Sequence, residues 1–392
     1  MKKIYKNILI IIILLLSIFA IYILYEAYRI RHAKVYVKLA NNLDIEVYSD
    51  IKISDLIKKI NGKIIDNNKI NTNKIGKKEI NFKYINDENI RINYKFNINI
   101  VDKIKPKILG PDIIKIEKNS TEDISKRFIC VDNYDDNPKC EIIGNYKNEI
   151  GTYYLTYKAV DKYKNENNKK FILNIVESNT KNSIKTKTYF EDVIKNYKRK
   201  NTKIGIDVSK WQGDIDFKKL NGVEFVIIRV GVQTEVNGQY YLDSKYKRNI
   251  EGFSNENIPV GVYFYSKADS SKEARKQAKW VVKQIKNYKI GLPIVFDWEN
   301  WQDFNDYQLS TYHLTNMYDV FKEEVNKKGY NSMLYSSKYY LENIWLKRDN
   351  IWLAHYTEKT DYNGDYKIWQ ICDDGVIDGI NGNVDIDIMY KW

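Results

Sequence analysis

Four acidic residues lie at or near the ends of short apolar runs in the second half of the chain: Asp207, Asp297, Glu299 and Asp385. Asp297 and Glu299 are two residues apart, so on an extended strand their side chains point to the same face. Two carboxyl groups held close in a partly dry site cannot both ionise easily, and one of them keeps its proton near neutral pH. The pair is therefore a candidate for acid catalysis.

A carboxylic acid beside a carboxylate is what glycoside hydrolysis requires. The acid protonates the leaving oxygen, and the carboxylate stabilises the positive charge that develops at the anomeric carbon. An isolated Asp-x-Glu also occurs as a surface carboxylate pair or as a pair of metal ligands. Here the pair follows the apolar run 292–296, which indicates that the two residues lie at the C-terminal end of a buried strand.

The elements that must position these carboxylates alternate between strand-like and helix-like segments. Apolar residues recur at helical spacing in 271–288 and in 309–328. Eight strands with crossover helices predict an irregular α/β barrel, in which catalytic groups lie at the C-terminal ends of the strands. The predicted strands are 203–207, 225–230, 260–265, 293–297, 332–335, 351–355, 367–371 and 384–389.

Residues 203–392 resemble the glycoside hydrolase family 25 lysozymes, the Chalaropsis-type muramidases. The matching segments follow the family's order: GIDVSKWQG at 205–213, FVIIR at 225–229, GVYFY at 261–265, DWE at 297–299, WLAHY at 352–356 and IWQ at 368–370. The resemblance implies a flattened barrel of the (β/α)5β3 type that cleaves peptidoglycan after N-acetylmuramic acid without a metal or organic cofactor. It implies Glu299 as the general acid, with Asp207, Asp297 and Asp385 in the same site.

The chain departs from the family pattern at two places. Asp387 stands where many relatives have Asn, and Ile371-Cys372 follows the Trp-Gln stretch where Tyr is more usual. An added negative charge at 387 either alters the pKa of the acid or is turned away from the site. Neither change removes a carboxylate of the candidate set.

Further candidates are expected to bind the substrate. Aromatic faces stack on sugar rings, and core packing is the alternative for each of them. We interpret His355 as a substrate-binding or structural group rather than a general base. The candidates are Trp211, Tyr263, Tyr265, Tyr335, Trp352, His355, Trp369 and Gln370.

There are two rival functions: a binding protein with the same barrel, and a different barrel hydrolase such as a chitinase. A binding protein would hold glycan without cutting it, and the complete carboxylate set argues against that function. A chitinase would carry a longer acidic motif on its fourth strand, which this sequence lacks. The sequence also shows no Ser/His/Asp arrangement and no phosphate-binding loop.

The N-terminal residues 1–32 are predicted to form a cytoplasmic head and an uncleaved transmembrane helix. The run 8–25 is apolar except for Ser17, and its length nearly spans a bilayer as a helix. A cleaved signal peptide is the alternative, but the run ends in bulky residues rather than in a small-residue cleavage site. We therefore predict a single-pass protein of a bacterial membrane with its C-terminal domain on the outer, wall-facing side.

Two copies of one unit are predicted between the membrane helix and the barrel, at 33–103 and 104–177. IGKKEINFKY at 75–84 corresponds to IGTYYLTYKA at 150–159, and each copy ends in a strand-like run. Short alternating strands predict small β-sandwich modules. The second copy resembles bacterial immunoglobulin-like modules, and we extend this interpretation to both. Their role is open between spacer and wall binding.

Charge is unevenly spread along the chain. Residues 203–392 contain 25 Lys and Arg against 27 Asp and Glu, so residues 1–202 carry the whole excess behind the net charge of +13. This pattern argues against a nucleic-acid enzyme and fits contact with anionic lipid or anionic wall polymer. The alternative is that the first half is merely rich in lysine and that its charge has no binding role. The basic segment 178–202 is predicted to be a linker with one helical stretch at 190–198.

Cysteine and histidine usage argues against a zinc site, because the chain has three of each and no Cys-x-x-Cys pair. Cys130 and Cys140 lie within one small module on the presumed oxidising side of the membrane. We predict a disulfide between them. Two reduced thiols are the alternative.

Overall fold

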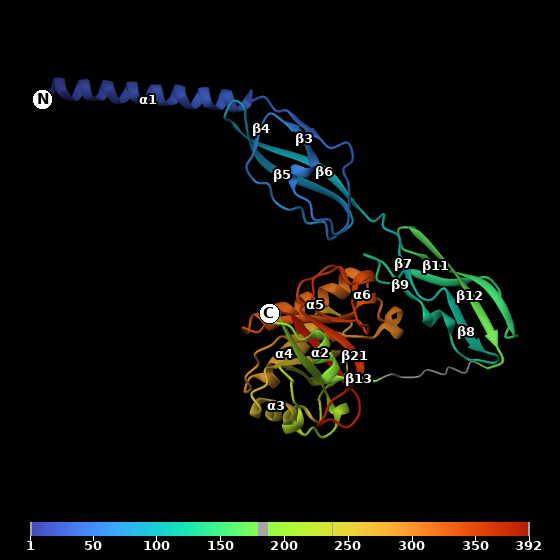
Figure 1. The fold of residues 1–392 in the computed structure, drawn as a ribbon. Coiled ribbons are helices and arrows are strands. Elements are labelled where there is room, and N and C mark those ends of the chain that lie inside the picture. Colours follow the sequence, from blue (N-terminus) through green and yellow to red (C-terminus); the bar gives the residue numbers. More distant parts are fainter. Residues whose placement is uncertain (1, 179–186, 237, 391–392) are drawn as a thin grey trace. The chain divides into compact units, whose positions relative to one another are not determined.

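The computed structural model describes residues 2–178, 187–236 and 238–390. The chain forms two compact units, the first ending at Lys103 and the second beginning at Ile104. The first unit opens with helix α1 (Lys2–Arg31), drawn in dark blue in Figure 1. Its span Ile4–Arg31 contains an 18-residue window with a mean hydropathy of 3.1 and is long and apolar enough to cross a membrane, a test that a signal sequence also passes.

The rest of the first unit, here module 1, is built around the long hairpin β5–β6. Buried and exposed residues alternate along both strands, which is the pattern of a sheet with one face on a core. β4 pairs with β5 and β2 runs parallel to β6, while β1 and β3 form a separate pair. The strands are β1 (Val37–Leu39), β2 (Asp44–Glu46), β3 (Ile57–Ile60), β4 (Gly62–Ile64), β5 (Gly76–Asn86) and β6 (Arg91–Val101), with the 3-10 turn η1 (Ile53–Leu56) before β3.

Residues 104–177, here module 2, have the same topology as module 1. The hairpin β11–β12 takes the place of β5–β6, with β10 antiparallel at one side, β8 parallel at the other and β7 paired with β9. The two modules are thus copies of one unit in strand order and direction. The strands are β7 (Lys107–Leu109), β8 (Ile113–Glu117), β9 (Ile129–Val131), β10 (Lys139–Ile143), β11 (Gly151–Val160) and β12 (Glu166–Val176), with η2 (Ile124–Arg127) before β9.

A disulfide joins Cys130 of β9 to Cys140 of β10 and so links the two sheets of module 2. The third cysteine, Cys372, is buried in the barrel domain. Burial raises the pKa of its thiol to about 12, so the thiolate form is rare near neutral pH.

Module 2 packs against the barrel domain through specific polar contacts. The Asn305 side chain accepts a hydrogen bond from the Cys130 amide and donates one to the Phe128 carbonyl, both at 2.9 Å. The Asp136 carboxylate accepts from the Ser310 amide at 2.9 Å, next to the first turn of helix α5 (Thr311–Asn326). Because these bonds join residues more than 170 positions apart, module 2 is part of the same compact unit as the barrel.

The barrel consists of eight strands that close on themselves. Seven run parallel, and the last, β22, closes the barrel by pairing antiparallel with both β21 and β14. The short strands β13 (Thr188–Tyr189) and β16 (Tyr240–Leu242) pair with the C-terminal ends of β21 and β15, respectively. The barrel strands are β14 (Thr202–Val208), β15 (Val226–Gln233), β17 (Val260–Ser266), β18 (Ile294–Trp298), β19 (Ser332–Ser337), β20 (Ile351–Ala354), β21 (Ile368–Val376) and β22 (Val384–Tyr390).

Five crossover segments connect the first six of these strands, but only four of them contain an α-helix among the described residues. The first crossover contains two 3-10 turns, η3 (Lys210–Gln212) and η4 (Phe217–Lys219), because Gly213 and Gly222 take positive φ angles of 64° and 84° that interrupt a helix. The helices are α3 (Tyr246–Asn255), α4 (Ser271–Ile285), α5 and α6 (Lys338–Asn343), with η5 (Trp301–Tyr307) before α5. Helix α2 (Phe190–Tyr197) precedes the barrel.

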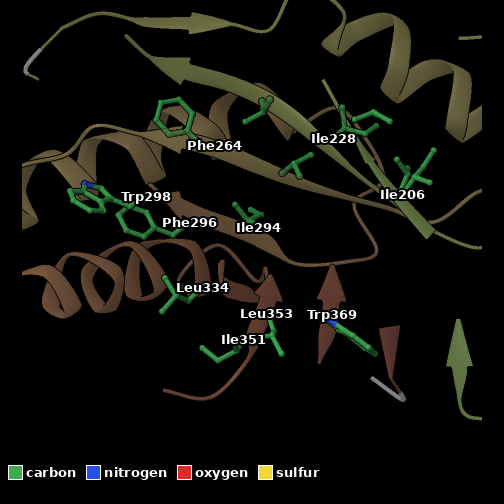
Figure 2. Close-up of a cluster of buried hydrophobic side chains, with 14 of the residues drawn as sticks. Ile206, Ile228, Phe264, Ile294, Phe296, Trp298, Leu334, Ile351, Leu353 and Trp369 are labelled. Atoms are coloured by element: carbon green, nitrogen blue, oxygen red, sulfur yellow. The ribbon is translucent and has the colours of Figure 1, made fainter. Parts of the chain in front are cut away.

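Alternation along the strands separates an outer core from the barrel interior. One set of alternate residues forms the apolar layer shared with the helices, and Figure 2 shows Ile206, Phe296 and Leu353 within it. The other set faces the interior, where Phe225, Val295 and neighbouring apolar side chains form a second cluster. Asp297 follows Val295 by two residues, so the same alternation turns its carboxylate inward.

A glycine makes room for that interior cluster. A Cβ atom on Gly205 would lie 2.5 Å from the Phe225 ring, far inside van der Waals contact. The absence of a side chain at 205 therefore lets Phe225 fill the interior, while Asp207, two residues later on β14, lies at the end of the strand.

Candidate active site

The strands bring the predicted carboxylates to one end of the barrel. Asp297 lies at the C-terminal end of β18, and Glu299 is the first residue after this strand. Asp207 lies near the C-terminal end of β14 and pairs in register with Asp385, near the start of the antiparallel strand β22. Because β22 runs in the opposite direction, its beginning lies at the same end of the barrel as the C-termini of the parallel strands.

Gln370 of β21 links two of these carboxylates. Its Nε2 atom donates to Asp207 Oδ2 at 2.8 Å and to Asp385 Oδ2 at 3.0 Å. Its Oε1 atom accepts from the hydroxyl groups of Tyr335 at 2.8 Å and Tyr356 at 3.0 Å. The buried amide is thus fully bonded, and it fixes the distance between two acidic groups that would otherwise repel each other.

Asp297 and Glu299 form a coupled pair. Asp297 is 3% exposed, and burial followed by the charge of Glu299 raises the pKa of its carboxyl well above the usual range. Burial also raises the pKa of Glu299, whose side chain nevertheless reaches solvent at the mouth of the barrel. The interaction between the two carboxyl groups raises the pKa of Asp297 further and lowers that of Glu299, so the pair holds a proton. Glu299 is the member that faces solvent and can reach a bound substrate.

The remaining carboxylates also have raised pKa values. Burial, then the neighbouring Asp373 and Glu299, raises the pKa of Asp385 to about 7. The pKa of Asp207 is raised well above its usual range by burial and by the charges of Asp385 and Asp387. The site therefore carries less negative charge near neutral pH than its composition suggests.

Asp387 belongs to this cluster and is not turned away from it. It is fully buried and accepts a hydrogen bond from Trp352 Nε1 at 2.8 Å. Burial raises the pKa of its carboxyl well above the usual range, and its charge acts on Asp207. The acid at position 387, where many relatives have Asn, is thus buried and receives a hydrogen bond from Trp352.

Arg229 supplies positive charge beside the carboxylates. Its guanidinium binds Asp243 through Nε at 2.8 Å and through a second nitrogen at 2.7 Å, and both residues are buried. The positive charge of Arg229 opposes the rise in the pKa of Asp297. Arg229 is not among the site residues predicted from the sequence, although a charged side chain inside the apolar run 225–230 is a usable signal. Tyr356 was missed as well, next to His355.

An open pocket of about 720 Å³ is lined by the ion pair of Arg229 and Asp243, and none of the four candidate carboxylates lines it. Trp211 lines it with a side chain that is 73% exposed, and the Lys210 ammonium lies 4.7 Å from the Trp211 ring centre. Tyr265 lines the same pocket, and the charges of Asp297 and Glu299 contribute to the raised pKa of its hydroxyl, about 12. Two of the eight predicted substrate-binding residues thus line a pocket large enough for a sugar.

The other predicted substrate-binding residues take different positions. Tyr263, Tyr335 and Trp352 belong to the interior of the barrel, where their rings contact one another. Trp369 belongs to the outer core, and its Nε1 donates to the His355 carbonyl. The His355 ring bonds to the Thr360 hydroxyl at 2.9 Å.

No three of the described carboxyl groups in the barrel bring oxygen atoms within 4.8 Å of one another. They are connected instead through donors such as the Gln370 amide and the Trp352 indole. The arrangement is that of proton-holding acids rather than of convergent ligands.

Comparison with known proteins gives a match over most of the barrel. The model of Glycosyl hydrolases family 25 matches residues 206–380. The autolytic lysozyme of Clostridium acetobutylicum is 28% identical over 189 residues, which are 47% of this chain and 54% of that protein. The uncharacterized protein YegX of Escherichia coli K12 is 27% identical over 198 residues, which are 47% of this chain and 68% of YegX. The chain therefore spans about half the length of the autolytic lysozyme.

Solved structures resemble the chain as well. The modular autolysin LytC from Streptococcus pneumoniae, solved in complex with a synthetic peptidoglycan ligand, is 26% identical with a TM-score of 0.44. The match covers 60% of this chain and 56% of LytC. The spore cortex lytic enzyme SleM from Clostridium perfringens is 21% identical with a TM-score of 0.42, over 49% of this chain and 68% of SleM.

Proposed function

Because residues 206–380 form a domain of glycosyl hydrolases family 25, we propose that the chain is a lysozyme that cleaves bacterial peptidoglycan. The bond cut is the β-1,4 bond between N-acetylmuramic acid and N-acetylglucosamine. The coupled pair of Asp297 and Glu299 is the observation on which this proposal rests, because it supplies a retained proton beside a carboxylate. The similarity to an autolytic lysozyme supports the substrate class.

The two residues have separate roles in this proposal. Glu299 is the general acid, since it reaches solvent at the barrel mouth and can approach the glycosidic oxygen. Asp297 is the more buried member and acts at the anomeric carbon, either by attacking it or by orienting the 2-acetamido group of the sugar for internal attack. Asp207 and Asp385, held by Gln370, complete the acidic wall of the site.

Mass spectrometry of digested peptidoglycan tests the proposed bond. Digestion of purified wall, followed by borohydride reduction, is expected to give fragments that end in reduced N-acetylmuramic acid. A matched digest with a known muramidase should give the same fragments. Reduced N-acetylglucosamine at the new ends would assign the opposite bond and contradict the proposal, while an undigested wall would favour a glycan-binding protein.

Retention of configuration at the anomeric carbon is expected. Asp297 and Glu299 are two residues apart and the charge of Glu299 acts on Asp297, so we expect their carboxyl groups to lie closer than the roughly 6.5–9.5 Å that an inverting enzyme needs to place a water between them. Proton NMR of the first product, recorded before mutarotation, should therefore show the β-anomer at the new reducing end. An initial α-anomer would mean inversion and would contradict the roles given to both residues.

Helix α1 is proposed to anchor the chain, with the modules and barrel on the wall side of the membrane. Its apolar residues 8–25 are exposed in the structure, as expected for a helix that lipid surrounds. The basic first half would then lie near anionic lipid or anionic wall polymer. The N-terminal sequence of the protein isolated from membranes is expected to begin before residue 8. A mature N-terminus beyond Tyr25 would identify a cleaved signal peptide instead.

A further inference from the structure

Two acidic side chains of module 2 are buried beside each other, outside the barrel. Asp132 directly follows β9 and Asp161 directly follows β11, and they are 1% and 4% exposed. A carboxylate oxygen of Asp132 lies within 4.8 Å of one of Asp161. Two carboxylates at this separation repel each other strongly when little water surrounds them.

Backbone amides hold the Asp132 carboxylate in place through one of its oxygens. Oδ1 accepts from the amides of Tyr134 at 2.9 Å and Asp135 at 2.7 Å. Oδ2 is buried, and no hydrogen-bond donor among the described residues reaches it. The Oδ1 atom of the adjacent Asn133 is also buried without a donor from the described part of the chain. The Asp132 Oδ2 atom is thus left for a partner of positive charge, and the next residue carries a second acceptor without a donor.

Asp161 is fixed in the same way by its own loop. Its Oδ1 accepts from the amides of Tyr163 and Asn165, both at 2.8 Å, and its Oδ2 accepts from Asn165 Nδ2 at 2.6 Å. Lys162 lies in this loop, but its ammonium is 3.8 Å from Asp135 and 4.5 Å from the centre of the Tyr134 ring. Neither carboxylate can therefore rotate away without losing the hydrogen bonds that it accepts from the backbone of its own loop.

We propose that Asp132 and Asp161, with the neighbouring Asn133 amide oxygen, form a divalent-cation site in module 2 that takes calcium. The donors are carboxylate and amide oxygens, which hard cations prefer. Calcium tolerates irregular geometry and completes its shell with water, whereas magnesium demands a near-ideal octahedron. Two protein carboxylates give a weak site, in the range of about 10⁻⁴–10⁻³ M that is typical of extracellular modules.

The site is connected to the barrel through the backbone of Asp132. The Asp132 carbonyl accepts from the Thr311 amide at 2.8 Å, at the first residue of helix α5. Asp136, four residues further on, accepts from the Ser310 amide beside it. A cation that fixes the loop 132–136 therefore also stabilises the contact between module 2 and the barrel, and its effect should appear in the unfolding of the whole second unit.

Thermal unfolding of the full chain in detergent micelles tests this site. With calcium at about ten times a Kd of ~10⁻³ M, the Tm of the wild type is expected to rise by about 3–5 °C above its value in EDTA. Asp132→Asn keeps the Oδ1 acceptor and should lose this rise. Asp112→Asn is the matched control, since it removes an exposed carboxylate of the same module that pairs with Lys169, and it should keep the rise.

The rank order of the variants makes the result decisive. In EDTA, Asp132→Asn should be at least as stable as the wild type, because it removes the repulsion, and in calcium it should be less stable. Terbium luminescence sensitised by Tyr134 and Tyr163, which flank the pair in sequence, should appear in the wild type and not in Asp132→Asn. A wild-type Tm that does not respond to calcium would show that the pair does not bind the cation. An equal response in all three proteins would place the cation elsewhere, and either result overturns the proposal.

Discussion

Glu299→Gln is expected to lower kcat on purified peptidoglycan by about 10²–10⁴-fold while the fold stays intact, because glutamine keeps the shape of the side chain but cannot donate the proton. The rate is measured as the release of new reducing ends from purified wall. Glu251→Gln, on the exposed face of helix α3, is the matched control and should leave the rate unchanged. Folding of each variant is checked by its Tm and circular dichroism.

The pH dependence of the wild type gives a second test of the same role. Burial raises the pKa of Glu299 above the ordinary carboxyl value, so its protonated form persists to higher pH. The value of kcat/KM should therefore fall on the alkaline side with an apparent pKa that belongs to the coupled pair and lies above about 4.3. A folded Glu299→Gln variant with near-wild-type turnover would end the assignment, whatever the shape of the profile.

The strands of the barrel could be located from the sequence because their apolar runs are long and regular. Each of the eight predicted strands overlaps an observed one, and the predicted helix at 271–288 begins where α4 begins. The two-residue spacing also predicted that Asp297 and Glu299 share a face, since local alternation fixes which face a side chain takes, and in the structure the charge of Glu299 acts on Asp297. The strands, the helix and the shared face all depend on residues that are close in the chain, so a single sequence is enough to predict them.

The contacts that complete the site depend on pairing between distant strands. Gln370 reaches Asp207 and Asp385 only because β21, β22 and β14 adjoin in the closed sheet, and no local pattern records that register. The same applies to Trp369, which is adjacent to Gln370 but lies on the opposite face of β21 in the outer core. A motif that contains both residues therefore predicts a shared region but not a shared role.

The docking of module 2 on the barrel was also beyond local sequence reasoning. Both modules were interpreted as spacers or wall-binding elements, yet module 2 shares apolar core with the barrel through Leu109, Ile129 and Val131. It also contacts η5, the turn that begins two residues after Glu299, through Asn305. Such contacts join segments far apart in the chain, and the segment 178–202, which was predicted to be a linker and of which 179–186 lie outside the described residues, gives no sign of them.

Asp297→Asn is expected to lower kcat by about 10²–10³-fold, because it removes the carboxyl group that acts at the anomeric carbon in the transition state. Asparagine is nearly isosteric, and relief of the repulsion with Glu299 should leave the Tm equal to or above that of the wild type. Asp365→Asn, an exposed change in the loop before β21, is the control for the reducing-end assay. A folded Asp297→Asn variant within tenfold of the wild-type rate would remove Asp297 from the mechanism.

The same residue decides between the two retaining routes. If Asp297 attacks the sugar directly, rapid quenching of the wild type during turnover should trap a glycosyl group on the protein, seen by mass spectrometry as added mass on the peptide that contains Asp297. If Asp297 only orients the 2-acetamido group, the intermediate is carried by the substrate and the protein mass stays unchanged. Substrates without the acetamide carbonyl should then be cleaved far more slowly. The resemblance to the family favours this second route, and the burial of Asp297 beside its partner is compatible with it, because an orienting carboxylate needs a fixed position rather than access to the sugar carbon.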